Sequence, residues 1–244
     1  MTVTNAQSGT SVQEIAAGVY RISTPIPPSA IPGGFTFNQI LIDDEAPLLF
    51  HTGPRRMFPL VREAVAHVLG DASRLRYVGF SHVEADECGA LNEWLGVAPA
   101  AEPVCGKVAA MVSVSDLADR APRALADGEE LSLGHKRVRW LDAPHLPHNW
   151  ECGYLYETST RTLLCGDLFT QPGHEGPALT EADVLEPSMA LYRMMGGIAL
   201  EQGTRGLLEK LAATEPSTLA TMHGSAYRGD GARLLRGLAT ALGV

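Results

Sequence analysis

The 244-residue chain is 45% hydrophobic and 19% charged, a balance that excludes a disordered or fibrous protein and indicates a globular one with a sizeable core. Its formal charge of −9 comes from 28 acidic and 19 basic residues, and the basic residues are scattered along the chain. The sequence therefore lacks the clustered basic face that a nucleic-acid partner would require.

The polar, uncharged segment 1–11 has neither the basic region nor the apolar region of a signal peptide, and we expect it to form a loose tail. No apolar run approaches the roughly 18 residues that a membrane-spanning helix needs. The four cysteines form no CxxC pair, a pattern typical of reduced thiols in a protein core. We therefore expect a soluble cytoplasmic protein that does not enter a membrane.

The first half of the chain alternates short apolar runs with turn residues and amphipathic stretches. A loop rich in proline and glycine is predicted between 24 and 34. Apolar residues at helical spacing predict helices over 60–69 and 86–95. In chain order, strands are predicted at 19–22, 36–42, 47–51 and 75–80.

The second half contains fewer clear helices and more short strands. A helical pattern is predicted over 180–213, with interruptions at its glycines, and a last helix over 230–242. The strands predicted here lie near Val104 and at 131–141, 153–158, 161–165 and 218–222, with a helix at 108–117 between the first two.

This order of elements is a run of strands, then strands alternating with helices, then more strands. It favours a layered α+β domain over a purely parallel sheet. No linker rich in proline, glycine or serine divides the chain, so we predict a single domain over 1–244.

The segment Phe80-Ser81-His82-Val83-Glu84-Ala85-Asp86-Glu87 carries the strongest chemical signal. His82, Glu84 and Asp86 alternate just after a predicted strand, and alternating residues of an extended segment point to the same side. Three acidic groups within four residues repel one another unless solvent or a cation neutralises them. The segment is therefore either a solvated polar loop or part of a metal site.

Three further candidate ligands also follow predicted strands: His148, Asp167 and His223. Each of these histidines, taken alone, is as well explained by core packing or by surface exposure. Four ligand-bearing segments at strand ends, however, are the arrangement by which a layered α/β protein builds a site at one edge. Together they favour the metal site.

These residues resemble the metallo-β-lactamase superfamily, and the His-x-Glu-x-Asp form is similar to its oxygen-binding diiron branch, to which the flavodiiron proteins belong. Most hydrolytic members have a histidine where this chain has Glu84. Asp167 follows His148 by 19 positions, which fits the family spacing, whereas it follows His145 by 22. The resemblance implies an αβ/βα sandwich and rests on the Asn38 strand, His51-Thr52-Gly53, the His82 segment, His148, Asp167 and His223-Gly224.

The resemblance also implies a metal pair. His82, Glu84 and His148 would hold the first ion, Asp167 would bridge, and Asp86 and His223 would hold the second. Carboxylates with imidazoles suit iron or manganese at least as well as zinc, so iron ranks first.

Two features depart from the family pattern. The family has a histidine where this chain has Glu87, so Glu87 and His145 are additional ligand candidates, and His174 is a third. No FMN-binding segment is visible, so a redox reaction would need a separate electron-donor protein.

Three functions follow from this pattern. The first is a diiron oxidoreductase that binds or reduces dioxygen or a related small oxidant. The second is a zinc hydrolase acting on an ester, thioester or lactam, and the third is a non-catalytic oxygen or metal sensor. The stretch 192–198 is a candidate interface for a homo-oligomer.

Overall fold

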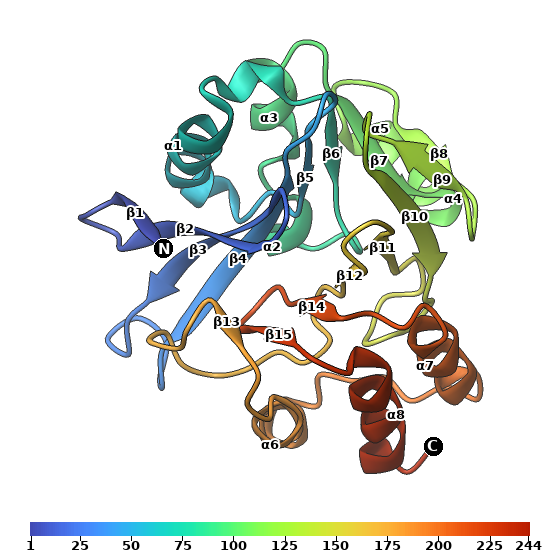
Figure 1. Cartoon of the computed structure of the whole chain (residues 1–244). Helices are drawn as coiled ribbons and strands as arrows, with labels where there is room; N and C mark the ends of the chain where they lie inside the picture. Colours follow the sequence, from blue (N-terminus) through green and yellow to red (C-terminus); the bar gives the residue numbers. More distant parts are fainter.

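Three hydrophobic clusters arrange the chain in four layers: helices, a sheet, a second sheet, and helices again (Figure 1). The computed structural model describes residues 1–244 and contains one sheet of eight strands and another of seven. One cluster fills the space between the sheets, and each of the others lies between a sheet and the helices outside it. The predicted αβ/βα sandwich is confirmed.

The first sheet runs from β1 to β8 in chain order, antiparallel up to β5 and parallel from there on. Its strands are β1 (Thr2–Asn5), β2 (Thr10–Ala16), β3 (Val19–Ile26), β4 (Phe35–Ile42), β5 (Leu48–Phe50), β6 (Tyr77–Gly79), β7 (Glu102–Gly106) and β8 (Arg123–Leu125). The helical segments between them are η1 (Arg55–Met57), α1 (Phe58–Leu69), η2 (Ala72–Arg74), α2 (Ala85–Cys88), α3 (Leu91–Val97), α4 (Lys107–Ala109), η3 (Ala110–Val114) and α5 (Ser115–Leu117).

The second sheet has the strand order β13-β15-β14-β12-β11-β10-β9. Its strands are β9 (Glu130–Ser132), β10 (Arg137–Asp142), β11 (Gly153–Glu157), β12 (Thr162–Leu164), β13 (Leu179–Thr180), β14 (Thr218–Ala220) and β15 (Ala226–Arg228). Helices α6 (Leu185–Met195), α7 (Thr204–Ala212) and α8 (Gly231–Leu242) lie on the side of this sheet away from the first (Figure 1). Asp230 caps α8 by accepting a hydrogen bond from the backbone N–H of Arg233 at 2.8 Å.

Residues 1–11 are not the loose tail that their composition predicts. Thr2–Asn5 pairs with β2 as an antiparallel hairpin, and the Thr10 hydroxyl lies 3.0 Å from that of Thr24 on β3. Backbone hydrogen bonds to a neighbouring strand hold this polar segment, and such pairing requires no apolar pattern.

Two predicted elements are divided in the structure. The strand expected over 131–141 is the β9–β10 hairpin, whose turn places Gly134 at a φ of +121°. The helix expected over 86–95 is split into α2 and α3 because Ala90 donates its backbone N–H to the Thr52 hydroxyl. The other predicted strands agree with the structure to within a few residues at each end.

None of the helices has both the length and the apolar character needed to cross a bilayer. Cys105, Cys152 and Cys165 are buried in hydrophobic clusters, as predicted, whereas Cys88 is half-buried. The assignment of 1–244 to a single domain stays a prediction.

The packing of Trp140 against β11 yields a stability prediction. A Cβ added to Gly153 would lie 2.2 Å from the ring of this fully buried tryptophan, whereas one added to the exposed Gly206 of α7 would meet nothing within 4 Å. Gly153→Ala should therefore lower the free energy of unfolding by about 1–3 kcal/mol through overpacking. Gly206→Ala, the matched control, should leave it unchanged or raise it by up to about 1 kcal/mol. Chemical denaturation measures both, and equal stability of the two variants would contradict the prediction.

Candidate metal centre

Four loops that follow β6, β10, β12 and β14 bring their polar side chains together at one edge of the sandwich. His82 Nε2 lies 3.0 Å from Glu84 Oε2 and 3.1 Å from His148 Nε2. His148 Nε2 is 3.3 Å from the same Glu84 oxygen and 3.5 Å from Asp167 Oδ2. The ligand atoms of these four residues all lie within 4.8 Å of one another, close enough to share one metal ion.

The second half of the cluster lies on the other side of Asp167. His223 Nε2 is 3.2 Å from Asp167 Oδ1 and 3.3 Å from Asp86 Oδ2. Because Oδ2 of Asp167 faces His148 and Oδ1 faces His223, its carboxylate stands between two groups of donors. This is the placement expected of a bridging ligand between two ions.

Glu87 completes the cluster from within the protein. Its side chain is fully buried, neither carboxylate oxygen has a hydrogen-bond partner, and Oε2 lies 3.9 Å from His82 Nε2. Burial, followed by the charges of Asp167 and Asp86, raises the pKa of the Glu87 carboxyl well above its usual value. An ionised carboxylate in this position needs a cation, so these residues fit a metal centre.

The backbone around these acidic residues differs from the extended segment that the alternating pattern predicts. Glu84 is extended, with φ −143° and ψ 163°, but α2 begins at the next residue. Asp86 and Glu87 therefore belong to a helical turn, which brings the Asp86 carboxylate near His223 and the Glu87 carboxylate near His82. The structure places His82 and Asp86 in two neighbouring groups of possible ligands that share Glu84, and the assignment of these residues as metal ligands stays a prediction.

Each of the three histidines is held through the ring nitrogen that faces away from the cluster. His223 Nδ1 donates to the Thr36 carbonyl at 2.7 Å, and His148 Nδ1 donates to the Gly197 carbonyl at 3.1 Å. His82 Nδ1 lies 2.9 Å from Ser81 Oγ. Such outer contacts select the tautomer that leaves Nε2 free to bind a metal.

Strand β4 holds the His223 loop from the opposite sheet. The Asn38 amide donates to the carbonyls of Thr221 and Gly224 at 3.1 and 2.9 Å. The buried Arg21 guanidinium donates to the same Gly224 carbonyl at 2.8 Å. Phe35 stacks on the His223 ring with a centroid distance of 4.3 Å. The sequence pattern pointed to Asn38, but it carried no signal for Arg21 or Phe35, whose roles depend on contacts across the sandwich.

The remaining sequence candidates lie elsewhere. His145 is exposed and takes no part in the converging ligand groups. His174 lies 3.9 Å from the exposed carboxylate of Glu175. Tyr192, expected at an interface, is buried instead and donates its hydroxyl to the Asp167 carbonyl at 2.7 Å, which places it among the supports of the site.

A cavity of about 400 Å³ opens in front of the cluster. Its wall combines the candidate ligands with apolar side chains, and Met194 and Met195 on its lining are 76% and 69% exposed. This volume suits a small substrate. The apolar and aromatic part of the wall is Ile31, Pro32, Phe35, Phe37, Pro172, Leu191, Tyr192, Met194 and Met195.

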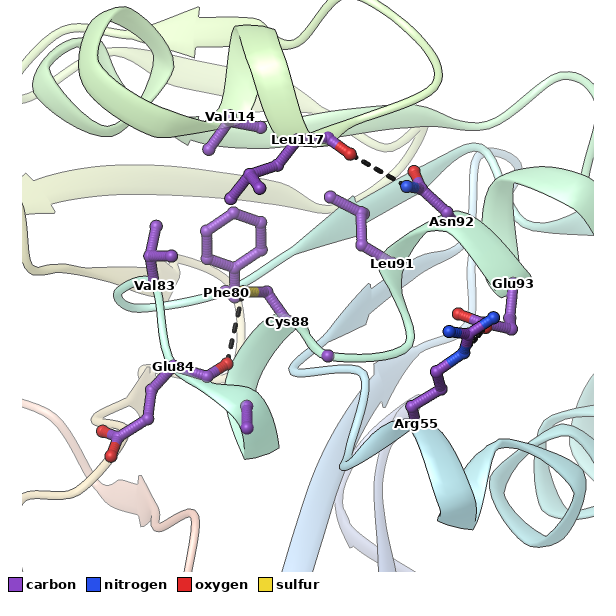
Figure 2. A pocket seen from close by; sticks show the side chains of 12 residues that line it. Arg55, Phe80, Val83, Glu84, Cys88, Leu91, Asn92, Glu93, Val114 and Leu117 are labelled. Atoms are coloured by element: carbon purple, nitrogen blue, oxygen red, sulfur yellow. Dashed lines mark hydrogen bonds and ion pairs between the residues drawn. The ribbon is translucent and has the colours of Figure 1, made fainter.

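A second cavity, of about 470 Å³, is lined by other residues of the Val83–Gly89 segment and shares only Glu84 with the first (Figure 2). Figure 2 shows the Glu84 carboxylate turned away from the apolar side chains that line it, including Phe80 and Leu91. The charged side chains at its edge, Arg55 and Glu93, pair with each other. The candidate metal chemistry therefore belongs to the first cavity.

The family model described as "ODP family beta lactamase" matches residues 35–224, a range that contains all six predicted ligands. The chain belongs to this family. The predicted resemblance to the diiron branch is thereby confirmed, while the role of each ligand stays a prediction.

Sequence relatives and solved structures agree with this assignment. Diflavin flavoprotein A 2 of Synechocystis sp. is 28% identical to this chain over 198 residues, which are 78% of this chain and 33% of that protein. Diflavin flavoprotein A 1 of Thermosynechococcus vestitus is 28% identical over 207 residues, 82% of this chain and 35% of that protein. The chain thus spans about a third of the length of these curated relatives.

Two solved structures share the fold over nearly the whole chain. The rubredoxin oxygen:oxidoreductase of Desulfovibrio gigas superposes with a TM-score of 0.80 at 18% identity, over 95% of this chain and 62% of that one. The Flv1 flavodiiron core of Synechocystis sp. superposes with a TM-score of 0.79 at 20% identity, over 96% of this chain and 61% of that one.

The electrostatics of His223 yield a pH prediction. Burial disfavours its charged form, but hydrogen bonds and ion pairs with Asp167 and Asp86 outweigh burial and raise the pKa of this imidazole to about 9. Since that value lies above the ordinary 6.5, the protonated ring stabilises the metal-free fold fully below about pH 6.5, and this contribution is lost as pH rises through 9. The melting temperature of chelator-treated protein should fall between about pH 7 and about pH 10, by roughly 2–4 °C for each kcal/mol lost.

The control for this experiment is His223→Gln, which cannot be protonated. Its melting temperature should change less over the same pH interval. An equal change in both proteins would assign the pH dependence to other groups and contradict the prediction.

Proposed function

We propose that the chain holds two iron ions and reduces dioxygen or a related small oxidant with electrons from a separate donor. His82, Glu84 and His148 hold the first ion, Asp86 and His223 hold the second, and Asp167 bridges them. The observation that carries this proposal is the Asp167 carboxylate, whose two oxygens face different histidines at 3.5 and 3.2 Å.

The charge of the cluster supports two divalent cations rather than one. Four carboxylates, those of Glu84, Asp86, Glu87 and Asp167, lie together with three histidines. Because Asp167 and Glu87 are buried, water does not screen their mutual repulsion. Two divalent ions would neutralise the four negative charges. Carboxylate-rich donor sets suit iron or manganese at least as well as zinc, so iron ranks ahead of both zinc and manganese in this proposal.

The redox reaction is supported by family membership and by the names of the relatives, which include a flavodiiron core and an oxygen:oxidoreductase. When bound, an iron pair supplies electrons to a small oxidant. The chain's own residues orient the histidines, and the apolar wall that includes Phe35 and Phe37 limits water in the cavity. In this proposal a separate donor protein supplies the electrons.

The zinc-hydrolase alternative ranks lower because Glu84 lies within the ligand group, at 3.0 Å from His82. No observation on the described residues favours a purely sensory role.

The first test is the metal content of protein purified without oxygen, followed by oxygen consumption with a chemical reductant. We expect about two iron atoms per chain and oxygen consumption that depends on them. Asp167→Ala should lose most of the metal, since it removes the bridge, whereas the exposed His145→Ala should retain it. Zinc as the main metal, with hydrolysis of a thioester or ester, would replace this proposal with the hydrolase. Near-normal metal in Asp167→Ala would refute the bridging role.

Glu87 allows a sharper prediction, because it occupies the position at which the family has a histidine. Glu87→Gln keeps its volume but removes its charge, and it should weaken binding of the second iron by about tenfold or more. Glu87→His offers a neutral nitrogen donor in the same place and should restore binding of two ions per chain. Stepwise metal titration under chelator competition separates the two ions. Unchanged affinity in Glu87→Gln would show that this side chain contributes neither a ligand nor a needed charge.

A further inference from the structure

The residue that follows β5 has an unusual backbone. His51 is 1% exposed and adopts a φ of +67°, in the left-handed region that side chains other than glycine rarely enter. Its backbone N–H donates to the Gly79 carbonyl of β6 at 2.8 Å. This contact fixes His51 beside the segment that carries His82. A buried residue held in this conformation is a candidate for a functional role.

The side chain of His51 connects to His82 through one hydroxyl. His51 Nε2 lies 3.1 Å from Ser81 Oγ, and Ser81 Oγ lies 2.9 Å from His82 Nδ1. All three side chains are buried, with exposed fractions of 1% or less. Solvent therefore does not compete for these two hydrogen bonds.

The direction of the hydrogen bonds follows from what His82 must do. For Nε2 of His82 to present its lone pair to a metal ion, the ring proton must reside on Nδ1. That N–H donates to Ser81 Oγ, and the Ser81 hydroxyl donates its own hydrogen to Nε2 of His51, which accepts. A neutral His51 meets this requirement.

His82 differs in this respect from the other two histidines of the centre. Nδ1 of His148 and Nδ1 of His223 donate to backbone carbonyls, which no substitution removes. The ring of His82 depends instead on two side chains, so its orientation is sensitive to the residues at 51 and 81.

We propose that His51 is a positioning residue, which acts through Ser81 to hold His82 in the tautomer and orientation that bind the first metal ion. The inference rests on the proposed metal centre. The left-handed backbone at His51 also positions the next residue, Thr52, whose N–H donates to the Glu87 carbonyl at 2.7 Å. The turn at His51 and Thr52 thus contacts both Ser81, which holds His82, and the backbone of Glu87.

The test measures Co²⁺ affinity by competition with a chelator, together with the visible absorption of the Co²⁺ protein. Ser81→Ala removes the hydroxyl, and His51→Asn keeps a residue that tolerates the left-handed backbone but is too short to reach Ser81. Both variants should bind the first Co²⁺ about 10- to 100-fold more weakly, with altered absorption. His51→Gln places an amide at similar reach and should restore most of the affinity.

The matched control is Ser188→Ala. Ser188 is also a fully buried serine, but its hydroxyl donates to the Val184 carbonyl within α6 at 2.6 Å. The Ser188→Ala variant should bind Co²⁺ with the same affinity as the wild type. Melting temperatures of the metal-free proteins show whether each variant folds, and a positioning role predicts weaker binding in variants that fold as wild type does.

Two outcomes would overturn the inference, and they are distinguishable. If wild type binds two Co²⁺ ions and folded Ser81→Ala binds them with wild-type affinity and absorption, the metal centre stands and the role of His51 fails. If wild type binds no Co²⁺, the metal centre itself fails and the inference with it.

Discussion

The mutual repulsion of carboxylates crowded together at one edge of the sandwich is the constraint on which this site depends. Asp167 is 9% exposed and Glu87 is fully buried, and both lie near further acidic side chains. In water such groups would repel only weakly, but burial strengthens the interaction and removes the compensating solvent. In the metal-free protein the raised pKa of Glu87 relieves part of this repulsion. The proposed pair of divalent cations would relieve it with all four carboxylates ionised.

The sandwich supplies the rigidity that such a centre needs. Two of the histidines are held by backbone carbonyls, and β4 reaches across from the first sheet to hold the loop of His223 in the second. The hydrogen bonds that Asn38 and Arg21 donate to that loop hold it against the first sheet, although the loop and these strands are far apart in the chain. Metal ligands held in this way need little rearrangement to bind an ion.

Membership of the family covers residues 35–224, and within that range the proposed centre departs from the family pattern at Glu87. Glu87 replaces a neutral donor by a charged one, which makes the second half of the centre more anionic and harder. The matched region forms about a third of the diflavin relatives. In the proposed arrangement, His82 is held through the side chains of Ser81 and His51, whereas His148 and His223 are held by backbone carbonyls.

The sequence by itself determined most of the helices and strands and the ligand candidates, because hydrophobic periodicity and the spacing of His82, Glu84 and Asp86 are local properties of the chain, but it did not indicate the strands β2, β8, β13 and β15. It did not reveal the hairpin of residues 1–11, the burial of Glu87, or the supporting contacts of Arg21. Only the tertiary structure decided these features, since each depends on residues distant in the chain: His223 and the Thr36 carbonyl that holds it are 187 positions apart. Strand pairing and burial are produced by packing, which no local pattern encodes.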